Sequence, residues 1–339
     1  MRMKNNSTLD PNSFQFRGIH PKILIGTASD RYAGWIGQIY TKERYHGRIS
    51  RRTNTVGKKS FTEDILPVDS VEEYFEHFPI LEIDYTFYRS LLGTDGKPTP
   101  NYHVLRRYHS YMKDMDYIIV KVPQMITAQK LRCGSTYREN ETYLNAEVFT
   151  RHFYEPAVDL LGPALTGFLF EQEYQRKQDR TPVSHMAQKL DAFFDAIPRD
   201  TRYHIELRTE SYLSTPVFEV LEKHGVGQAL SYWTWLPPLR KQFTKANRIL
   251  FNSGGQLVVR LITPIGMRYE AAYEKAHPFD TLVEGMLRHE MVEETVFLMK
   301  TALEEGVQMN LIINNRAGGN APLIARHIKE QFIETFSII

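Results

Sequence analysis

The chain of 339 residues has a formal net charge of +2, with 42% hydrophobic and 24% charged residues, which is typical of a folded globular protein and excludes a disordered or collagen-like one. The near-zero charge excludes binding to nucleic acid or membranes through bulk charge alone. The single cysteine, Cys133, excludes an internal disulfide and a cysteine-rich zinc site. The N-terminal residues lack the apolar core of a secretory signal, and no run of about 18 apolar residues occurs, so we expect a cytoplasmic protein with no membrane partner.

Short runs of β-branched and aromatic residues alternate along the chain with amphipathic segments of helical length. The predicted strands are Lys22–Thr27, Ile80–Thr86, Tyr117–Val122, Leu165–Phe170, Arg202–Leu207, Val226–Ser231, Gln256–Ile262 and Gln308–Asn314. The predicted helices between them include Val71–Phe78, Glu147–Leu161, Val183–Ile197 and Thr281–Glu305. This alternation indicates an α/β protein with a parallel sheet.

Eight such units predict a (β/α)₈ TIM barrel as a single domain. An open doubly wound sheet is less favoured, because the turn after the first strand, IGTASD, lacks the G-x-G-x-x-G pattern. We place the barrel at residues 21–339, after a polar N-terminal extension over residues 1–20. The connections after the first and third strands, Ala28–Asp69 and Pro123–Ala146, are long, and such loops form the active face of a barrel.

Period-two alternation along the strands directs several polar side chains into the barrel. They are Glu82, Asp84, Thr86, Lys121, His204, Glu206, Arg208, Arg260, Asn310 and Asn314. One interpretation is a structural layer of ion pairs, such as Glu82 with Lys121 and Glu206 with Arg208 or Arg260. The other is an active site near the C-terminal strand ends, with Glu206 and Glu82 as acid and base.

In the second interpretation the cations Lys121, Arg208 and Arg260 hold an anionic group of the ligand. Asn314 and Asn315 orient a hydroxyl or a carbonyl group. Asp84 and Thr86 belong to the same inward set and are candidates for substrate binding.

Several of these residues lie in segments that resemble a known family. The segments, in chain order across Ile25–Ala325, are IGTASDRYAGWIGQIY, LEIDYTFYR, IIVKVPQMIT, LLGPAL, HIELRTESY, VVRLI and IINNRAGGNAPLIA. Together they resemble the YecE-like family, domain-of-unknown-function family number 72. The resemblance implies a TIM-type barrel with no assigned activity. It also implies that the family's recurring polar positions are here Glu82, Thr86, Tyr88, Lys121, Glu206, Arg208, Arg260 and Asn314.

The sequence departs from the family pattern at three places. Ala28–Asp30 stands where the family usually has Ser-Gly-Trp, and Phe170–Glu173 where it usually has Gln and a pair of prolines. At the end of the seventh strand, where Arg-Leu-His-Gly is usual, this chain has Arg260-Leu261-Ile262-Thr263, so the departure is at Ile262–Thr263. All three lie at the predicted mouth of the barrel, so the resemblance leaves the substrate open.

Three tryptophans, Trp35, Trp233 and Trp235, fall in predicted loops of the active face. Flat aromatic rings stack on sugars or nucleobases, and they also pack beneath loops or against a second subunit. The sequence does not decide between these roles, and it leaves the oligomeric state open.

Two further segments could bind anions. The segment Lys42–Lys59 holds seven lysine and arginine residues against one glutamate, which suits phosphate groups or nucleic acid but also describes a solvated loop. Gly318 and Gly319 precede a predicted helix that starts near Ala321, where barrels often hold phosphate. The alternative there is a simple glycine turn with Asn320 as the N-cap.

The sequence lacks H-x-H and H-E-x-x-H motifs and a P-loop, so we expect no metal site and no cofactor. The leading hypothesis is a metal-independent hydrolase that acts on a sugar-like, nucleotide-like or phosphorylated small molecule through Glu82 and Glu206. A non-catalytic protein that binds a phosphorylated ligand, or nucleic acid through Lys42–Lys59, is the alternative. A third interpretation is an oligomerisation scaffold that uses the loop around Trp233 and Trp235.

Overall fold

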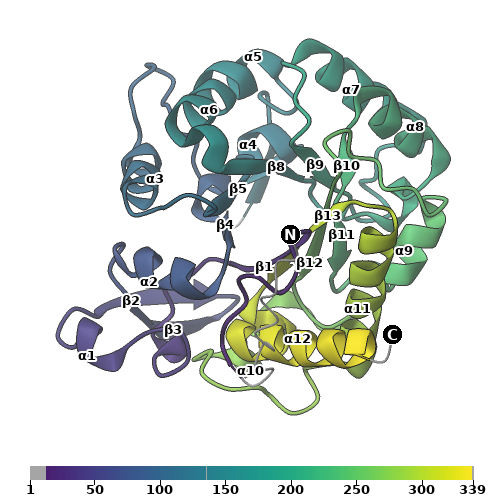
Figure 1. Cartoon of the computed structure of the whole chain (residues 1–339). Helices are drawn as coiled ribbons and strands as arrows, with labels where there is room; N and C mark the ends of the chain where they lie inside the picture. The colour runs from purple at the N-terminus through teal and green to yellow at the C-terminus, as the bar shows by residue number, and fades with distance from the viewer. Residues whose placement is uncertain (1–12, 135, 338–339) are drawn as a thin grey trace, which may run out of the picture.

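The computed structural model describes residues 13–134 and 136–337 and contains a TIM-type barrel of parallel strands (Figure 1). The barrel strands are β1 Ile23–Ala28, β4 Ile80–Ile83, β5 Tyr117–Lys121, β8 Leu165–Glu171, β9 Tyr203–Glu206, β10 Gly227–Gln228, β11 Leu230–Tyr232, β12 Gln256–Leu261 and β13 Gln308–Ile313. Their order in the sheet is β10-β9-β8-β5-β4-β1-β13-β12-β11. The first and last strands of this order are consecutive in the chain, so the sheet closes on itself.

The sixth barrel strand is split at Ala229. The residue lies between β10 and β11, and its amide donates to the carbonyl oxygen of Ile205 on β9. On the two sides of Ala229, β10 pairs with β9 and β11 pairs with β12. Counted as one strand, this stretch is the predicted strand Val226–Ser231, and the (β/α)₈ prediction is confirmed.

Helices surround the strands (Figure 1). The longer ones are α2 Ser70–His77, α3 Pro100–Ser110, α7 Val183–Ala196, α8 Thr215–His224, α10 Tyr269–Ala276, α11 His289–Glu304 and α12 Ala321–Ser337. The shorter ones are α1 Lys42–Tyr45, α4 Gln124–Thr127, α5 Ala146–Phe149, α6 Glu155–Leu161 and α9 Leu239–Lys245. The helix predicted over Thr281–Glu305 begins only at His289, because Gly285 adopts a φ of +73° that a helix does not allow.

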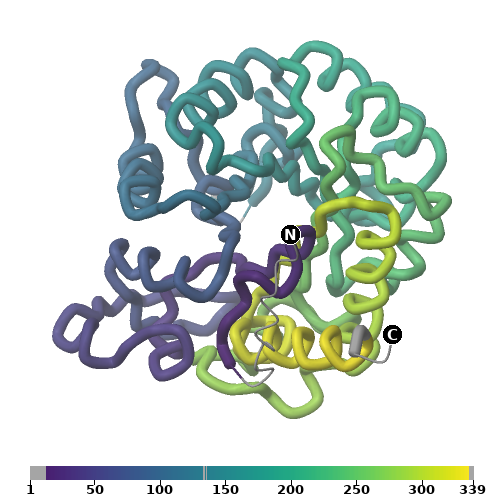
Figure 2. Tube along the Cα trace, viewed as in Figure 1, coloured from purple at the N-terminus to yellow at the C-terminus, as the bar shows by residue number. Residues whose placement is uncertain are grey.

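Both long connections contain a β-hairpin. The first pairs β2 Ser50–Val56 with β3 Lys59–Ile65, and the second pairs β6 Lys130–Cys133 with β7 Thr136–Glu139. The first hairpin lies at the periphery beside α10 (Figure 2), where Val56 joins a hydrophobic cluster with Ala272 and Tyr273. The extra length of the first loop thus forms a wall at one side of the barrel mouth.

Two separate hydrophobic cores flank the strands. Small and branched side chains fill the barrel interior, namely Ala28, Ile80, Ile119, Leu169, Ala229, Val258 and Ile312. Leu81, Ile83, Ile205 and Leu207 belong to the larger core between strands and helices. The predicted alternation is therefore confirmed, and it directs Glu82 into the barrel.

The described end of the predicted N-terminal extension packs against the barrel. Phe16 is buried and stacks on Phe78 with ring centroids 4.4 Å apart, and Arg17 forms an ion pair of 2.7 Å with Asp116. These contacts place residues 13–20 across the N-terminal ends of the strands (Figure 1). Residues 1–12 of that extension lie outside the described residues. Within the described chain, no helix is both long enough and apolar enough to cross a membrane.

Candidate functional site

Six charged side chains meet inside the C-terminal end of the barrel and form what we call the charge layer. Its members are Glu82, Lys121, Glu171, Glu206, Arg208 and Arg260. Arg260 lies at the centre. It binds both oxygens of Glu82, at 2.8 Å through Nε and 2.7 Å through Nη2. Its Nη1 contacts Glu171 at 3.1 Å and also Glu206.

The other two cations close the network from the side of the mouth. Arg208 donates through Nε to Glu206 at 2.6 Å and contacts Glu171 through Nη2 at 2.9 Å. Lys121 lies 2.7 Å from Glu171 and 4.2 Å from the centre of the Phe87 ring. Three carboxylates thus balance three cations.

This pairing keeps two carboxylates of the charge layer, Glu171 and Glu206, ionised. Burial alone would raise the pKa of Glu206, but Arg208 and Arg260 outweigh it and hold that pKa below the ordinary value. Burial likewise opposes ionisation of Glu171, and Arg208, Lys121 and Arg260 together hold its pKa far below the ordinary value. A carboxylate held in this way is a poor proton donor at neutral pH.

The structure corrects the predicted pairing of this layer. Glu82 pairs with Arg260 instead of Lys121, because Arg260 reaches across the barrel from β12. Glu82 and Glu206 bind the same guanidinium and do not face each other across an open pocket. Glu171 was missed as a site residue. Extending the predicted strand by one residue would have found it, since Gly167, Leu169 and Glu171 alternate inward.

A cavity of about 870 Å³ opens at the mouth, and we call it the mouth cavity. Residues that follow β1, β4 and β13 line it, together with the first hairpin and α10. Because β1 pairs with both β4 and β13, these three strand ends are neighbours. They bring Asp30, Asp84 and Arg316 to one place.

Asp30 is the most perturbed acid of the mouth cavity. Its side chain is 3% exposed, Oδ1 accepts a 2.8 Å hydrogen bond from the Tyr108 hydroxyl, and Oδ2 has no partner among the described residues. Burial raises the pKa of Asp30 to about 7 and the nearby charge of Asp84 adds to this, although Tyr108 and Arg31 oppose it. Asp30 therefore carries a proton for part of the time at neutral pH.

Asp84 lies at the end of β4 and is half-buried. Its Oδ1 accepts a 2.8 Å hydrogen bond from the hydroxyl of Ser29, which precedes Asp30. Ser29 has a φ of +67°, so the chain turns sharply there and directs Asp30 beneath the loop. The two acids thus come from adjacent strand ends but lie in different surroundings.

Other predicted binding residues support the loops or line the mouth. Thr86 donates to the carbonyl oxygen of Lys121 at 2.7 Å, and Asn314 accepts from the Arg316 amide at 3.0 Å. Tyr88 is 72% exposed and lines the mouth cavity. Trp35 is fully buried, and its Nε1 donates to Asn315 at 3.0 Å, so a ligand could not reach its ring without movement of the loop.

The remaining tryptophans lie at the ends of other strands. Trp233 is buried, with the guanidinium of Arg208 4.8 Å from the centre of its ring. Trp235 is 41% exposed and stacks on Tyr174 at a centroid distance of 5.5 Å. Of the three, Trp235 is the most accessible ring.

The backbone amides around Gly318 and Gly319 already have acceptors. Both glycine amides donate to the carbonyl oxygen of Asn315, and the Ala321 amide donates to the Asn315 side chain. Asn320 caps α12 by accepting from the Leu323 amide at 2.9 Å. A phosphate at this turn would have to displace these bonds.

Most cations of the Lys42–Lys59 segment are paired with acids. The pairs are Arg44 with Glu72, Arg48 with Asp69, Arg51 with Asp64, Arg52 with Glu63, and Lys59 with Glu274. Five of the seven cations thus have a partner that the local sequence count did not include. The positive charge available to a phosphate backbone is correspondingly smaller.

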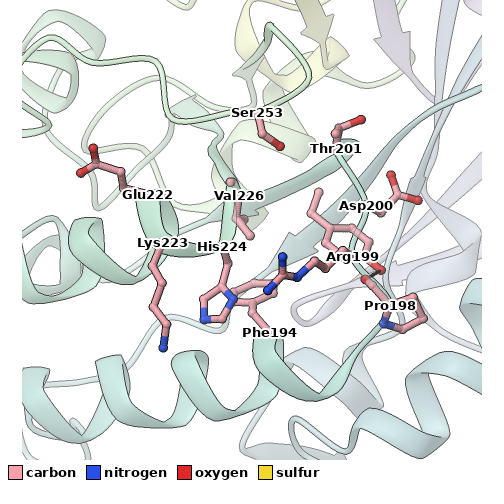
Figure 3. A pocket seen from close by; sticks show the side chains of 12 residues that line it. Phe194, Pro198, Arg199, Asp200, Thr201, Glu222, Lys223, His224, Val226 and Ser253 are labelled. Carbon is pink, nitrogen blue, oxygen red and sulfur yellow. Dashed lines mark hydrogen bonds between the residues drawn. The ribbon is translucent and has the colours of Figure 1, made fainter.

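A second cavity of about 400 Å³ lies at the opposite, N-terminal face (Figure 3). Arg199, Asp200 and Ser253 line it from the loops that precede β9 and β12, and His224 lines it from the end of α8. His224 is bound through Nε2 to Asp191 at 2.6 Å. This end of a TIM barrel serves stability, so we place the functional site at the mouth cavity. The described residues contain no cluster of three His, Cys, Asp or Glu side chains that could hold a metal ion.

Comparisons with known proteins agree with the architecture. The model of the family described as "Protein of unknown function DUF72" matches residues 24–337. A DUF72 family protein from Thermotoga maritima is 15% identical, with a TM-score of 0.52 over 93% of this chain and 99% of that one. One from Enterococcus faecalis is 16% identical, with a TM-score of 0.51 over 92% of this chain and 95% of that one. At these identities the likeness shows the fold alone.

A more distant structural match is a xylanase from Paenibacillus barcinonensis. It is 11% identical, with a TM-score of 0.40 over 91% of this chain and 87% of that one. No curated protein matches the chain in sequence.

Proposed function

Because the chain belongs to the DUF72 family, which is named for the absence of an assigned function, we propose a function from the site itself: hydrolysis of a sugar-like substrate in the mouth cavity. In this proposal Asp30 is the acid and Asp84 is the base. The observation that carries it is the pair of neighbouring carboxyl groups in unlike surroundings, one of them buried with a pKa of about 7.

Most glycosidases cleave their bond with two carboxyl groups, one protonated and one ionised, and the different surroundings of the two groups set these states. Burial raises the pKa of Asp30 to about 7, whereas Asp84 is half-buried and accepts a hydrogen bond from Ser29. The tyrosines Tyr32, Tyr88 and Tyr269 line the same cavity and offer flat faces and hydroxyl groups to a sugar ring.

The reaction balances with water as the second substrate. The proton of Asp30 goes to the leaving oxygen as its bond to the sugar carbon breaks. A water oxygen bonds to that carbon, and Asp84 takes the proton that the water releases. A proton returned from Asp84 to Asp30 through solvent restores the starting state.

This proposal moves the acid and base roles away from Glu206 and Glu82. Both are bound to Arg260, and Glu206 is bound to Arg208 as well, so the carboxylate oxygens of both residues are already engaged by cations of the protein. We propose that the charge layer instead fixes the strand ends beneath the cavity. Arg208 and Lys121 form its side toward the mouth.

The test is turnover of a panel of p-nitrophenyl glycosides by the full chain and by the variants Asp30→Asn and Asp84→Asn. We expect each variant to lose about 10²–10⁴-fold in kcat, as is typical when a general acid or base is removed. The rate should also fall as the pH rises through about 7, where Asp30 loses its proton.

Asp280→Asn is the matched control, because Asp280 also lines the cavity but is exposed to solvent. This variant should keep the wild-type rate. Full activity of Asp30→Asn would remove the proposed acid. Loss of activity in Glu206→Gln alone, with the fold intact, would return the role to the charge layer.

The alternative function is non-catalytic binding of a phosphorylated ligand or of nucleic acid through Lys42–Lys59. Wild-type affinity for an oligonucleotide that falls steeply with salt, together with no turnover of any glycoside, would favour it. The ion pairs of that segment are the reason we rank it second.

A further inference from the structure

We infer that the substrate of the mouth cavity carries an anionic group, a carboxylate or a phosphate, that binds to Arg316. This inference rests on the proposed function and narrows its substrate class from sugars in general to acidic sugars. It depends on the arginines of the cavity, which fall into two kinds.

Arg316 is half-buried at the end of β13 and lines the cavity near Asp84 and Tyr88. Its guanidinium carbon lies 4.5 Å from the centre of the Tyr269 ring, so the side chain is held beside that ring. It forms no ion pair with any residue in the described part of the chain, and its buried Nε has no acceptor there.

Arg31 is a second guanidinium of this kind. It follows Asp30, lines the same cavity and donates through Nε to the carbonyl oxygen of Leu66 at 2.6 Å. Within residues 13–134 and 136–337 it too lacks a carboxylate partner at ion-pair distance.

The third arginine of the cavity wall, Arg52, is paired with Glu63 at 2.7 Å. In the charge layer Arg208 and Arg260 are also fully paired. The chain therefore pairs most of its arginines in this region but leaves two half-buried ones facing a cavity.

A half-buried cation without an acidic partner is unfavourable unless a ligand supplies the charge. A planar guanidinium presents two parallel N–H donors, which match the two oxygens of a carboxylate or a phosphate. Arg316 meets this description more fully than Arg31, whose Nε is already used.

The experiment is calorimetric titration of the full chain with D-glucose, D-glucuronic acid and glucose 6-phosphate. We expect one of the two anionic sugars to bind at least about tenfold more tightly than glucose, as a charge-assisted hydrogen-bond pair would give. Tighter binding of glucuronic acid would identify the group as a carboxylate, and tighter binding of glucose 6-phosphate would identify it as a phosphate. Arg316→Gln should abolish the gain, and Arg316→Lys should keep only part of it because the ammonium lacks the planar fork.

Arg51→Gln is the control for a general loss of positive charge. Arg51 lies on the neighbouring hairpin and is paired with Asp64 at the surface, so this variant should change the affinities less than about twofold. Equal affinity for all three sugars, binding of none of them, or undiminished preference in Arg316→Gln would each overturn the inference.

Binding is measured without turnover, so the two proposals fail separately. Hydrolysis of neutral glycosides with no anionic preference removes the inference and keeps the hydrolase. Selective binding of an anionic sugar, with no glycoside hydrolysed, removes the hydrolase and keeps the anion site at Arg316.

Discussion

The charge layer and the mouth cavity lie at the same end of the barrel, and both contain acids and arginines. They differ in how completely these charges are paired within the protein. In the charge layer, Arg260 alone contacts three carboxylates, and Glu171 contacts three cations. In the mouth cavity, and among the described residues, Asp30 has one oxygen without a hydrogen-bond partner and Arg316 forms no ion pair with an acid. A set of charges that is complete within the protein holds the fold together, whereas an incomplete set is available to a ligand.

The largest expected effect is on the charge layer. Replacing Arg260 by leucine leaves Glu82, Glu171 and Glu206 buried together without their central cation. Removing one partner of a buried ion pair destabilises by about 3–5 kcal/mol, and here three carboxylates lose it. We expect Arg260→Leu to lower the urea midpoint severely or to prevent folding.

Lys121→Met is the matched comparison within the layer. Of the three carboxylates of the layer, Lys121 forms an ion pair with Glu171 alone, and its side chain is 10% exposed. Its loss should lower the urea midpoint less than Arg260→Leu does. A wild-type midpoint in Arg260→Leu would mean that the layer does not hold the fold.

The second prediction has the opposite sign. Burial raises the pKa of Asp30 from 3.8 to about 7, so between these values the folded protein binds a proton that the unfolded chain has released. Folding is therefore less favourable at high pH than at low pH because of this residue. Asp30→Asn removes the ionisation and should stabilise the protein at pH 8 by about 1–3 kcal/mol.

Urea unfolding at pH 8 and at pH 5 tests this effect. The gain of Asp30→Asn over the wild type should shrink at pH 5, where the folded wild type keeps its proton. Tyr108 can still donate to the amide oxygen of the asparagine, so the hydrogen bond gives no reason for a loss. Destabilisation at both pH values would mean that Asp30 is held as a paired carboxylate like those of the charge layer.

The regular parts of this architecture could be predicted from the sequence. Alternation in LEIDY and YHIEL directs Glu82 and Glu206 inward, and the structure confirms both. The partners could not be predicted in the same way, because the register of the closed sheet decides which inward side chains share a layer. Glu82 pairs with Arg260 at a separation of 178 residues, and only the closed barrel brings the two together.

The mouth cavity was harder to predict than the charge layer. Asp84 was among the candidate binding residues, but Asp30 and Arg316 lie in loops without a repeating pattern. The buried Asp30 is hydrogen-bonded to Tyr108, 78 residues away in the sequence. A sequence gives the identity of such an acid but not the loss of water that changes its pKa.

The smallest expected effect is on an ion pair at the surface. Because this pair is exposed, it shows how much two paired charges stabilise the protein when they are not buried. Arg51 and Asp64 form an ion pair of 2.9 Å on the first hairpin, with the arginine side chain 78% exposed. Water screens such a pair, so a double-mutant cycle of Arg51→Gln and Asp64→Asn should give a coupling energy of about 0.2–1 kcal/mol. The same cycle on Arg260→Gln and Glu82→Gln should give a larger coupling, since burial weakens the screening. Equal coupling energies in the two cycles would contradict this, because they would show that burial of the charge layer does not strengthen its ion pairs.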